Sequence, residues 1–97
     1  MNDYLPTEFN LGQNYPNPFK DKTIIKYCVP YKTNVLIKVY NSIGEEIETL
    51  VDEEKKAGTY EIEFKLAVSS RQLANGTYFC RFEAGDFRSE KRMHIIG

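Results

Sequence analysis

A chain of 97 residues can form one domain with a modest hydrophobic core, and it is too short for two. Its 13 basic and 14 acidic residues give a net charge of −1, which argues against a general nucleic-acid-binding protein. No apolar run is long enough to span a bilayer, and the N-terminus lacks the basic and apolar regions of a signal peptide.

The chain opens with a proline-rich segment, residues 1–22, which we expect to be an extended lead-in to a β-sandwich formed by residues 23–96. Within it, Pro16 and Pro18 each fix φ at about −65° and push the preceding residue toward an extended conformation. A helix is therefore excluded, and a central strand is disfavoured because each proline removes a ladder donor. We predict that this rigid segment packs the rings of Tyr15 and Phe19 on the sandwich. Residues 1–97 are expected to form a single domain.

The rest of the chain predicts β-strands, because apolar and polar residues alternate with a period of two between turn signals. In Glu45–Val51 the apolar Ile47 and Leu50 are three residues apart, which predicts a bulge or a change of face. The charged segment Asp52–Lys56 is predicted to be a solvated loop. The other predicted elements are the strands Thr23–Val29, Asn34–Tyr40, Thr59–Leu66, Thr77–Ala84 and Phe87–Ile96, and a short turn of helix at Ser69–Leu73.

Six or seven short strands with little helix indicate an antiparallel β-sandwich. The spacing Gly76-x-Tyr78-x-Cys80 resembles the start of strand F in immunoglobulin-like domains, where a "tyrosine corner" hydroxyl bonds to the backbone upstream. We expect Tyr78 to bond near Leu73 or Ala74, in an all-β, immunoglobulin-like sandwich of about seven strands. The predicted core is Ile25, Tyr27, Val29, Val35, Ile37, Val39, Ile47, Tyr60, Ile62, Phe64, Leu73, Tyr78, Phe82 and Met93.

The two cysteines are predicted to remain unpaired. Alternation places Cys28 opposite the buried face of its strand and Cys80 on the buried face with Tyr78, so the two side chains cannot approach as a disulfide requires. The likeness to antibody domains argues for the opposite result. With His94 as the only histidine, the two cysteines cannot complete a zinc site, and we expect no metal or cofactor.

No catalytic motif is present in the sequence. Glu45, Glu46 and Glu48 lack the spacing of a calcium loop, and a sandwich of this size rarely has the cleft that a glycosidase needs. Ser69 and Ser70 are not part of a strained nucleophile turn and form no triad with a histidine. We therefore expect that the protein is not an enzyme.

Six motifs occur in an order and spacing that resemble the C-terminal sorting domains of the type IX secretion system (type A). The resemblance covers nearly all of residues 9–96. The motifs are Leu11-Gly12-Gln13-Asn14-Tyr15-Pro16-Asn17-Pro18-Phe19, Thr23-x-Ile25-Lys26-Tyr27-x-Val29-Pro30, Val39-Tyr40-Asn41-x-x-Gly44, Ala57-Gly58-Thr59-Tyr60, Leu73-Ala74-x-Gly76-x-Tyr78-Phe79 and Lys91-Arg92-Met93.

The resemblance implies a non-catalytic sorting signal at the C-terminus of a larger secreted protein of Bacteroidetes-like bacteria. Such a domain directs an upstream catalytic or adhesive cargo domain from the periplasm through the outer-membrane secretion machinery to the cell surface. A sortase-like protease usually then removes it. The motif residues with a mainly structural role are Asn14, Tyr15, Pro16, Asn17, Pro18, Phe19, Gly44, Gly58, Gly76 and Tyr78.

Recognition of the signal is expected on the last strand, at Lys91, Arg92 and His94. We expect this strand to offer outward side chains and unpaired backbone groups to a receptor. Charged residues on an edge strand also prevent edge-to-edge association, which is an alternative reason for their presence.

Two other functions fit a small secreted β-sandwich: carbohydrate binding, and a structural spacer of a secreted hydrolase. Carbohydrate binding would use outward rings, and the candidates are Tyr31, Tyr40, Phe79 and Phe87, although the usual tryptophan is absent. Export of a fused reporter separates the sorting function from both alternatives, and a polysaccharide pull-down separates carbohydrate binding from a spacer.

Overall fold

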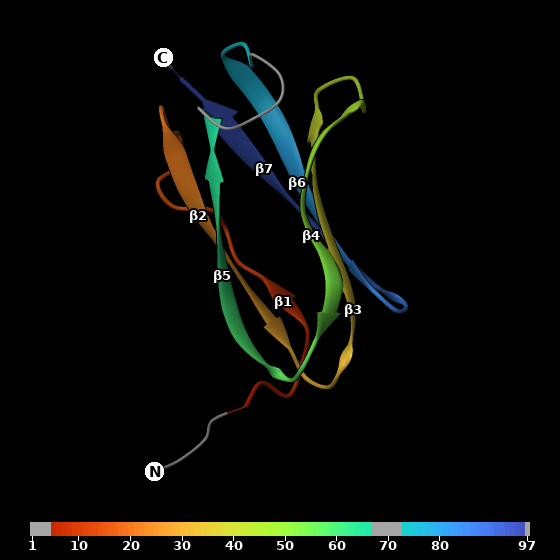
Figure 1. The fold of residues 1–97 in the computed structure, drawn as a ribbon. Coiled ribbons are helices and arrows are strands. Elements are labelled where there is room, and N and C mark those ends of the chain that lie inside the picture. The colour runs from red at the N-terminus through yellow and green to blue at the C-terminus, as the bar shows by residue number, and fades with distance from the viewer. Residues whose placement is uncertain (1–4, 67–72, 97) are drawn as a thin grey trace.

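The computed structural model describes residues 5–66 and 73–96, which form two antiparallel sheets packed face to face (Figure 1). The strand order is β1-β2-β5 in the three-stranded sheet and β4-β3-β6-β7 in the four-stranded sheet. The described part of the chain contains no apolar helix that could cross a membrane. The strands are β1 (Asn10–Leu11), β2 (Lys22–Val29), β3 (Thr33–Asn41), β4 (Glu46–Lys55), β5 (Gly58–Lys65), β6 (Gly76–Ala84) and β7 (Phe87–Ile95).

The predicted all-β sandwich of seven strands is confirmed. Its sheets correspond to the two sheets of immunoglobulin-like domains, with the fourth strand placed beside the third. The tyrosine corner is also confirmed, since the Tyr78 hydroxyl donates a hydrogen bond to the Ala74 carbonyl oxygen at 2.7 Å. The predicted helical turn at Ser69–Leu73 falls mainly on residues 67–72, which lie outside the described residues.

The core lies between the two sheets and is centred on Phe82, whose ring meets Phe9, Tyr27 and Phe87 edge-on. All the predicted core residues are buried except Tyr60, Ile62 and Leu73, which are half-buried at its margin. Tyr60 and Ile62 belong to β5, and the outer edge of that strand has no neighbouring strand among the described residues. Further buried apolar residues, outside the set predicted as the core, are Leu11, Phe19, Val51, Cys80, Ala84 and Ile95.

The charged segment after Val51 is a strand and not the predicted loop. Asp52 pairs with Leu36 and Lys55 pairs with Thr33, so β4 continues to the end of its hairpin with β3. An edge strand tolerates charge along much of its length because its free edge and outer face are solvated. The predicted bulge is confirmed, since the register of β3 with β4 skips Leu50.

Cys28 and Cys80 are both free thiols, as predicted from their opposite faces. Cys28 lies on the outer face of its sheet, with Sγ 3.8 Å from Thr59 Oγ1. Cys80 is buried in the core, and this burial, with a smaller contribution from Glu90, raises the pKa of its thiol to about 12.

Candidate recognition surface

The terminal half of β7 is paired with the lead-in. The Phe19 amide donates to the His94 carbonyl oxygen at 3.0 Å, and the Ile96 amide donates to the Phe19 carbonyl oxygen at 2.8 Å. These two bonds form a parallel bridge between Phe19 and Ile95. The expectation that the end of the last strand offers unpaired backbone groups is therefore wrong at these positions.

Lead-in side chains bond to the same edge. Asn17 Oδ1 accepts a hydrogen bond from the His94 amide at 2.9 Å, and Gln13 Nε2 donates to the Arg92 carbonyl oxygen at 2.7 Å. The Asn17 side chain therefore satisfies a backbone N–H of β7 that a neighbouring strand would otherwise bond. A proline at position 17 could not do so, because its side chain has no acceptor. Residues nearly 80 positions apart in the sequence therefore make one continuous edge.

The other side of the lead-in is bonded to β2. Tyr15 and Ile24 exchange both backbone hydrogen bonds at 2.9 Å. The buried Asn14 amide donates to Thr23 Oγ1 at 3.0 Å and to the Pro16 carbonyl oxygen at 3.1 Å. The lead-in consequently bridges β2 of one sheet and β7 of the other, and it closes this side of the sandwich (Figure 1).

The two aromatic rings of the lead-in have opposite environments. Phe19 is buried and meets Phe64 edge-on, with ring centroids 6.0 Å apart, as predicted. The prediction that Tyr15 also packs on the domain is wrong, because 79% of this residue is exposed. Directly paired residues of antiparallel strands point to the same face, and Tyr15 is paired with the outward-facing Ile24.

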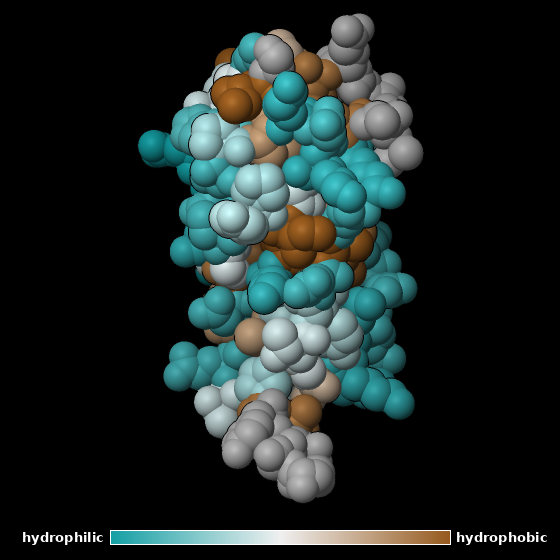
Figure 2. Space-filling model, turned by 90° about the vertical axis from the view of Figure 1, so that its left-hand side faces the viewer, coloured by the Kyte–Doolittle hydropathy of each residue, from teal (hydrophilic) through white to brown (hydrophobic). Residues whose placement is uncertain are grey.

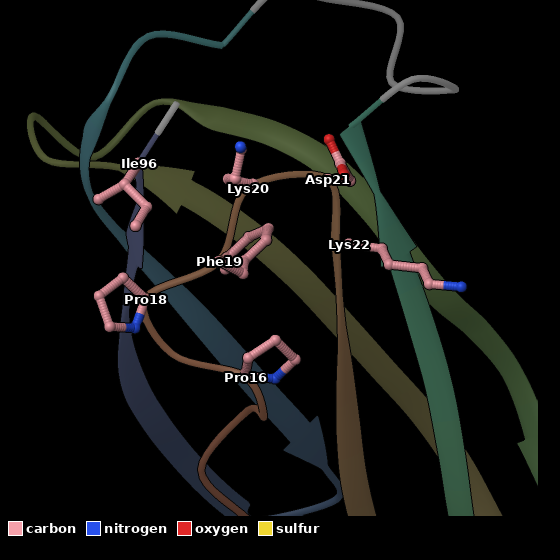
Figure 3. Close-up of a pocket in the computed structure, with 7 residues that line it drawn as sticks. All are labelled: Pro16, Pro18, Phe19, Lys20, Asp21, Lys22 and Ile96. Carbon is pink, nitrogen blue, oxygen red and sulfur yellow. The ribbon is translucent and has the colours of Figure 1, made fainter.

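Where the lead-in crosses the end of β7, a hollow of about 350 Å³ opens (Figure 3). Pro18 lies near Ile96 there, and the Phe19 ring points inward between them and the start of β2. Two of the motif glycines have a backbone reason for their identity, since φ is 89° at Gly44 and 142° at Gly76. Gly58 has no such constraint, and a Cβ there would make only ordinary contact with the Tyr60 ring.

The three expected recognition residues do not share one face. Lys91 is paired with the inward-facing Cys80, so its half-buried side chain lies on the core side at the sandwich margin. Arg92 and His94 are exposed on the outer face of the four-stranded sheet. His94 Nδ1 lies 3.2 Å from Thr77 Oγ1 on β6.

Arg92 stands beside two aromatic residues that were candidates for carbohydrate binding. Phe79 is its direct partner on β6, and Tyr40 is the next residue across, on β3. The guanidinium carbon of Arg81 lies 4.4 Å from the Tyr40 ring centroid. Both rings are half-buried. Their outward positions followed from period-two alternation, but their alignment with Arg92 depends on strand register.

Charge on this outer face is only partly neutralised. Arg81 pairs with Glu90 at 3.4 Å, and Lys38 pairs with Glu46 at 2.9 Å, which lowers the pKa of the Glu46 carboxyl. Arg92 forms no ion pair with any described residue. The face therefore combines aromatic surface with a guanidinium that has no ion pair to a described residue, and aromatic residues and arginine are both common at protein interfaces.

The other two rings considered for carbohydrate binding differ in exposure. Phe87 is not an outward ring, because it stacks on Phe9 with centroids 5.0 Å apart and covers the core. Tyr31 is 61% exposed. Among the described residues no group of His, Cys, Asp and Glu is arranged to hold a metal ion.

These features define a small all-β domain whose lead-in and last strand are joined along one edge. Residues 13–96 match the family described as the secretion system C-terminal sorting domain, and the chain belongs to this family. The domain is thus a C-terminal sorting signal of type IX secretion, which marks a protein for secretion or display at the cell surface. Domains of this family are generally non-catalytic.

No curated protein matches the sequence. Among solved structures, the fold is similar to part of dimeric latent PorU from Porphyromonas gingivalis, with a TM-score of 0.63 and 16% sequence identity. The match covers 87% of this chain and 9% of the PorU chain. At this identity the likeness concerns the fold alone.

Proposed function

We propose that the domain carries an upstream catalytic or adhesive cargo from the periplasm through the outer-membrane secretion machinery, and that a sortase-like protease acts on the exported protein. The family assignment over residues 13–96 is the observation that supports this proposal most directly. The chain also enters the sandwich at the end opposite to the one where β7 finishes (Figure 1). A cargo joined ahead of β1 would therefore lie away from the end of β7.

The residues that the machinery reads are, in this proposal, Arg92 and His94 on the outer face, with Lys91 contributing from the sandwich margin. Arg92 supports it best, since its guanidinium is exposed, has no ion pair among the described residues, and lies next to Phe79. An acidic partner surface would complement it. Electrostatic complementarity of this kind gives selectivity and fast association.

The test is export of a folded reporter fused ahead of residue 1, in a bacterium that has the type IX system. Arg92→Glu should strongly reduce the rate at which the reporter appears outside the cell. Arg88→Glu is the matched control, because Arg88 is also exposed on the outer face of β7 and also lacks an ion pair with a described residue. Lys91 is left unchanged because reversing a half-buried charge would disturb the core.

Thermal unfolding of each purified variant must show that the sandwich is intact. Deletion of residues 89–97 is a poorer test, since it removes the partner of both β6 and the lead-in. If the folded Arg92→Glu variant is exported at the normal rate, the secretion machinery does not recognise this side chain. If the wild-type reporter stays inside the cell, the sorting function itself is refuted.

A further inference from the structure

The backbone that carries the exposed ring of Tyr15 is held in a fixed position. Its backbone amide and carbonyl are both bonded to Ile24, and the next residue is a proline, so the backbone carrying the ring has little freedom. The ring itself is 79% exposed, and its hydroxyl has no hydrogen-bond partner in the described part of the chain. The fold thus uses the backbone of Tyr15 and leaves its side chain unused.

A hollow of about 420 Å³ lies beside this ring on the outer face of the three-stranded sheet. It is lined by Gln13, Tyr15, Ile24, Lys26 and Glu61, and the half-buried Ile24 is the apolar residue among them that β2 directs outward. Seen from the side of β2 and β5, this face is mainly hydrophilic with an apolar area at mid-height (Figure 2). Tyrosine is one of the side chains that most often carry the binding energy of a protein interface.

The two charged side chains that line the hollow, Lys26 and Glu61, already pair with each other. Lys26 pairs with Glu61 at 3.5 Å, while Lys22 and Lys65 both pair with Glu63, at 3.4 and 3.3 Å. A charged side chain entering the hollow would have to compete with the pair of Lys26 and Glu61. An uncharged apolar side chain would instead cover Ile24 and the Tyr15 ring without disturbing any ion pair.

We propose that Tyr15 and this hollow form a docking site for a protein of the secretion machinery, which places an uncharged apolar side chain against Tyr15 and Ile24. The inference rests on the sorting function proposed above and adds a second contact to it. Gln13 connects the hollow with β7, since it lines the hollow and its side chain donates a hydrogen bond to the Arg92 carbonyl oxygen. One partner could therefore contact the edge formed by the lead-in and β7 while it fills the hollow.

Export of the same reporter tests this site with three substitutions. Tyr15→Ala should lower the initial rate of export at least tenfold, the loss expected when an interface anchor is truncated. Tyr15→Phe should be exported at the wild-type rate, because the hydroxyl has no partner. Tyr31→Ala is the matched control, since Tyr31 is 61% exposed and lies away from the hollow.

Raised salt separates this contact from the one at Arg92. In washed cells that continue to export, the deficit of Tyr15→Ala should be the same at low and high ionic strength, whereas an ion-pair contact weakens with salt.

Normal export of folded Tyr15→Ala would overturn the inference. An equal loss of export with Tyr31→Ala would also overturn it. The same holds if the Tyr15→Ala domain is exported normally but no longer binds a polysaccharide that the wild-type domain binds. Failure of the wild-type reporter to leave the cell would refute the sorting function and not this site alone.

Discussion

Replacing Phe19 by alanine measures how far the lead-in belongs to the cooperative core of the sandwich. The Phe19 ring is only 2% exposed and meets Phe64 edge-on across the core. Truncating a buried phenylalanine costs about 3–5 kcal/mol. Since a domain of this size is stable by about 5–15 kcal/mol, Phe19→Ala should remove a large share of the free energy of unfolding.

Urea denaturation followed by circular dichroism and by tyrosine fluorescence would measure this loss. The midpoint should fall with an unchanged m-value, and the melting temperature should drop by about 4–8 °C per kcal/mol. Tyr15→Ala, four residues away and exposed, should change the free energy of unfolding by less than about 0.5 kcal/mol. A loss below about 1 kcal/mol for Phe19→Ala would show that residues 23–96 fold without help from the lead-in, contrary to this reasoning.

Tyr78→Phe should lower the free energy of unfolding by about 0.5–1.5 kcal/mol in the same urea assay, because it removes the hydrogen bond to Ala74. An unchanged urea midpoint would show that this hydrogen bond does not stabilise the domain. A thiol reagent at pH 8 should modify Cys28 and spare Cys80 until the domain is unfolded, since burial raises the pKa of the Cys80 thiol to about 12; equal rates for the two thiols would contradict this. The unfolded chain loses the Cys80 proton first, so stability should fall as pH rises from about 9 toward 12, by up to about 1.4 kcal/mol per pH unit. The raised pKa of the buried Tyr27 adds to this slope, and Cys80→Ala should flatten it in urea titrations at pH 8 and 10.

Much of the sandwich could be predicted because its determinants are local. A strand with one buried face needs apolar residues at every second position, and Ile25, Tyr27 and Val29 show this pattern in the sequence and are buried in the structure. The same periodicity predicted the outward Cys28 and the inward Cys80. Tyr78 followed from a motif whose hydrogen bond spans only four residues.

Edge strands were harder to predict, because solvent on their open side relaxes the requirement for alternation. The charged end of β4 is a strand only because β3 lies beside it to supply the ladder bonds. Lys91 was expected to point outward with Arg92, although adjacent residues of a strand point to opposite faces. The register with Cys80 decides which of the two side chains lies on the core side.

The sequence by itself determined most of the strands and their core faces, the tyrosine corner and the family motifs. The tertiary structure alone decided that the lead-in joins β2 to β7, that it covers the end of the last strand, and that Tyr15 is exposed while Phe19 is buried. The first set depends on residues close together in the chain. The second set depends on contacts such as Asn17 with His94, across 77 positions, and no local periodicity specifies a partner at that separation.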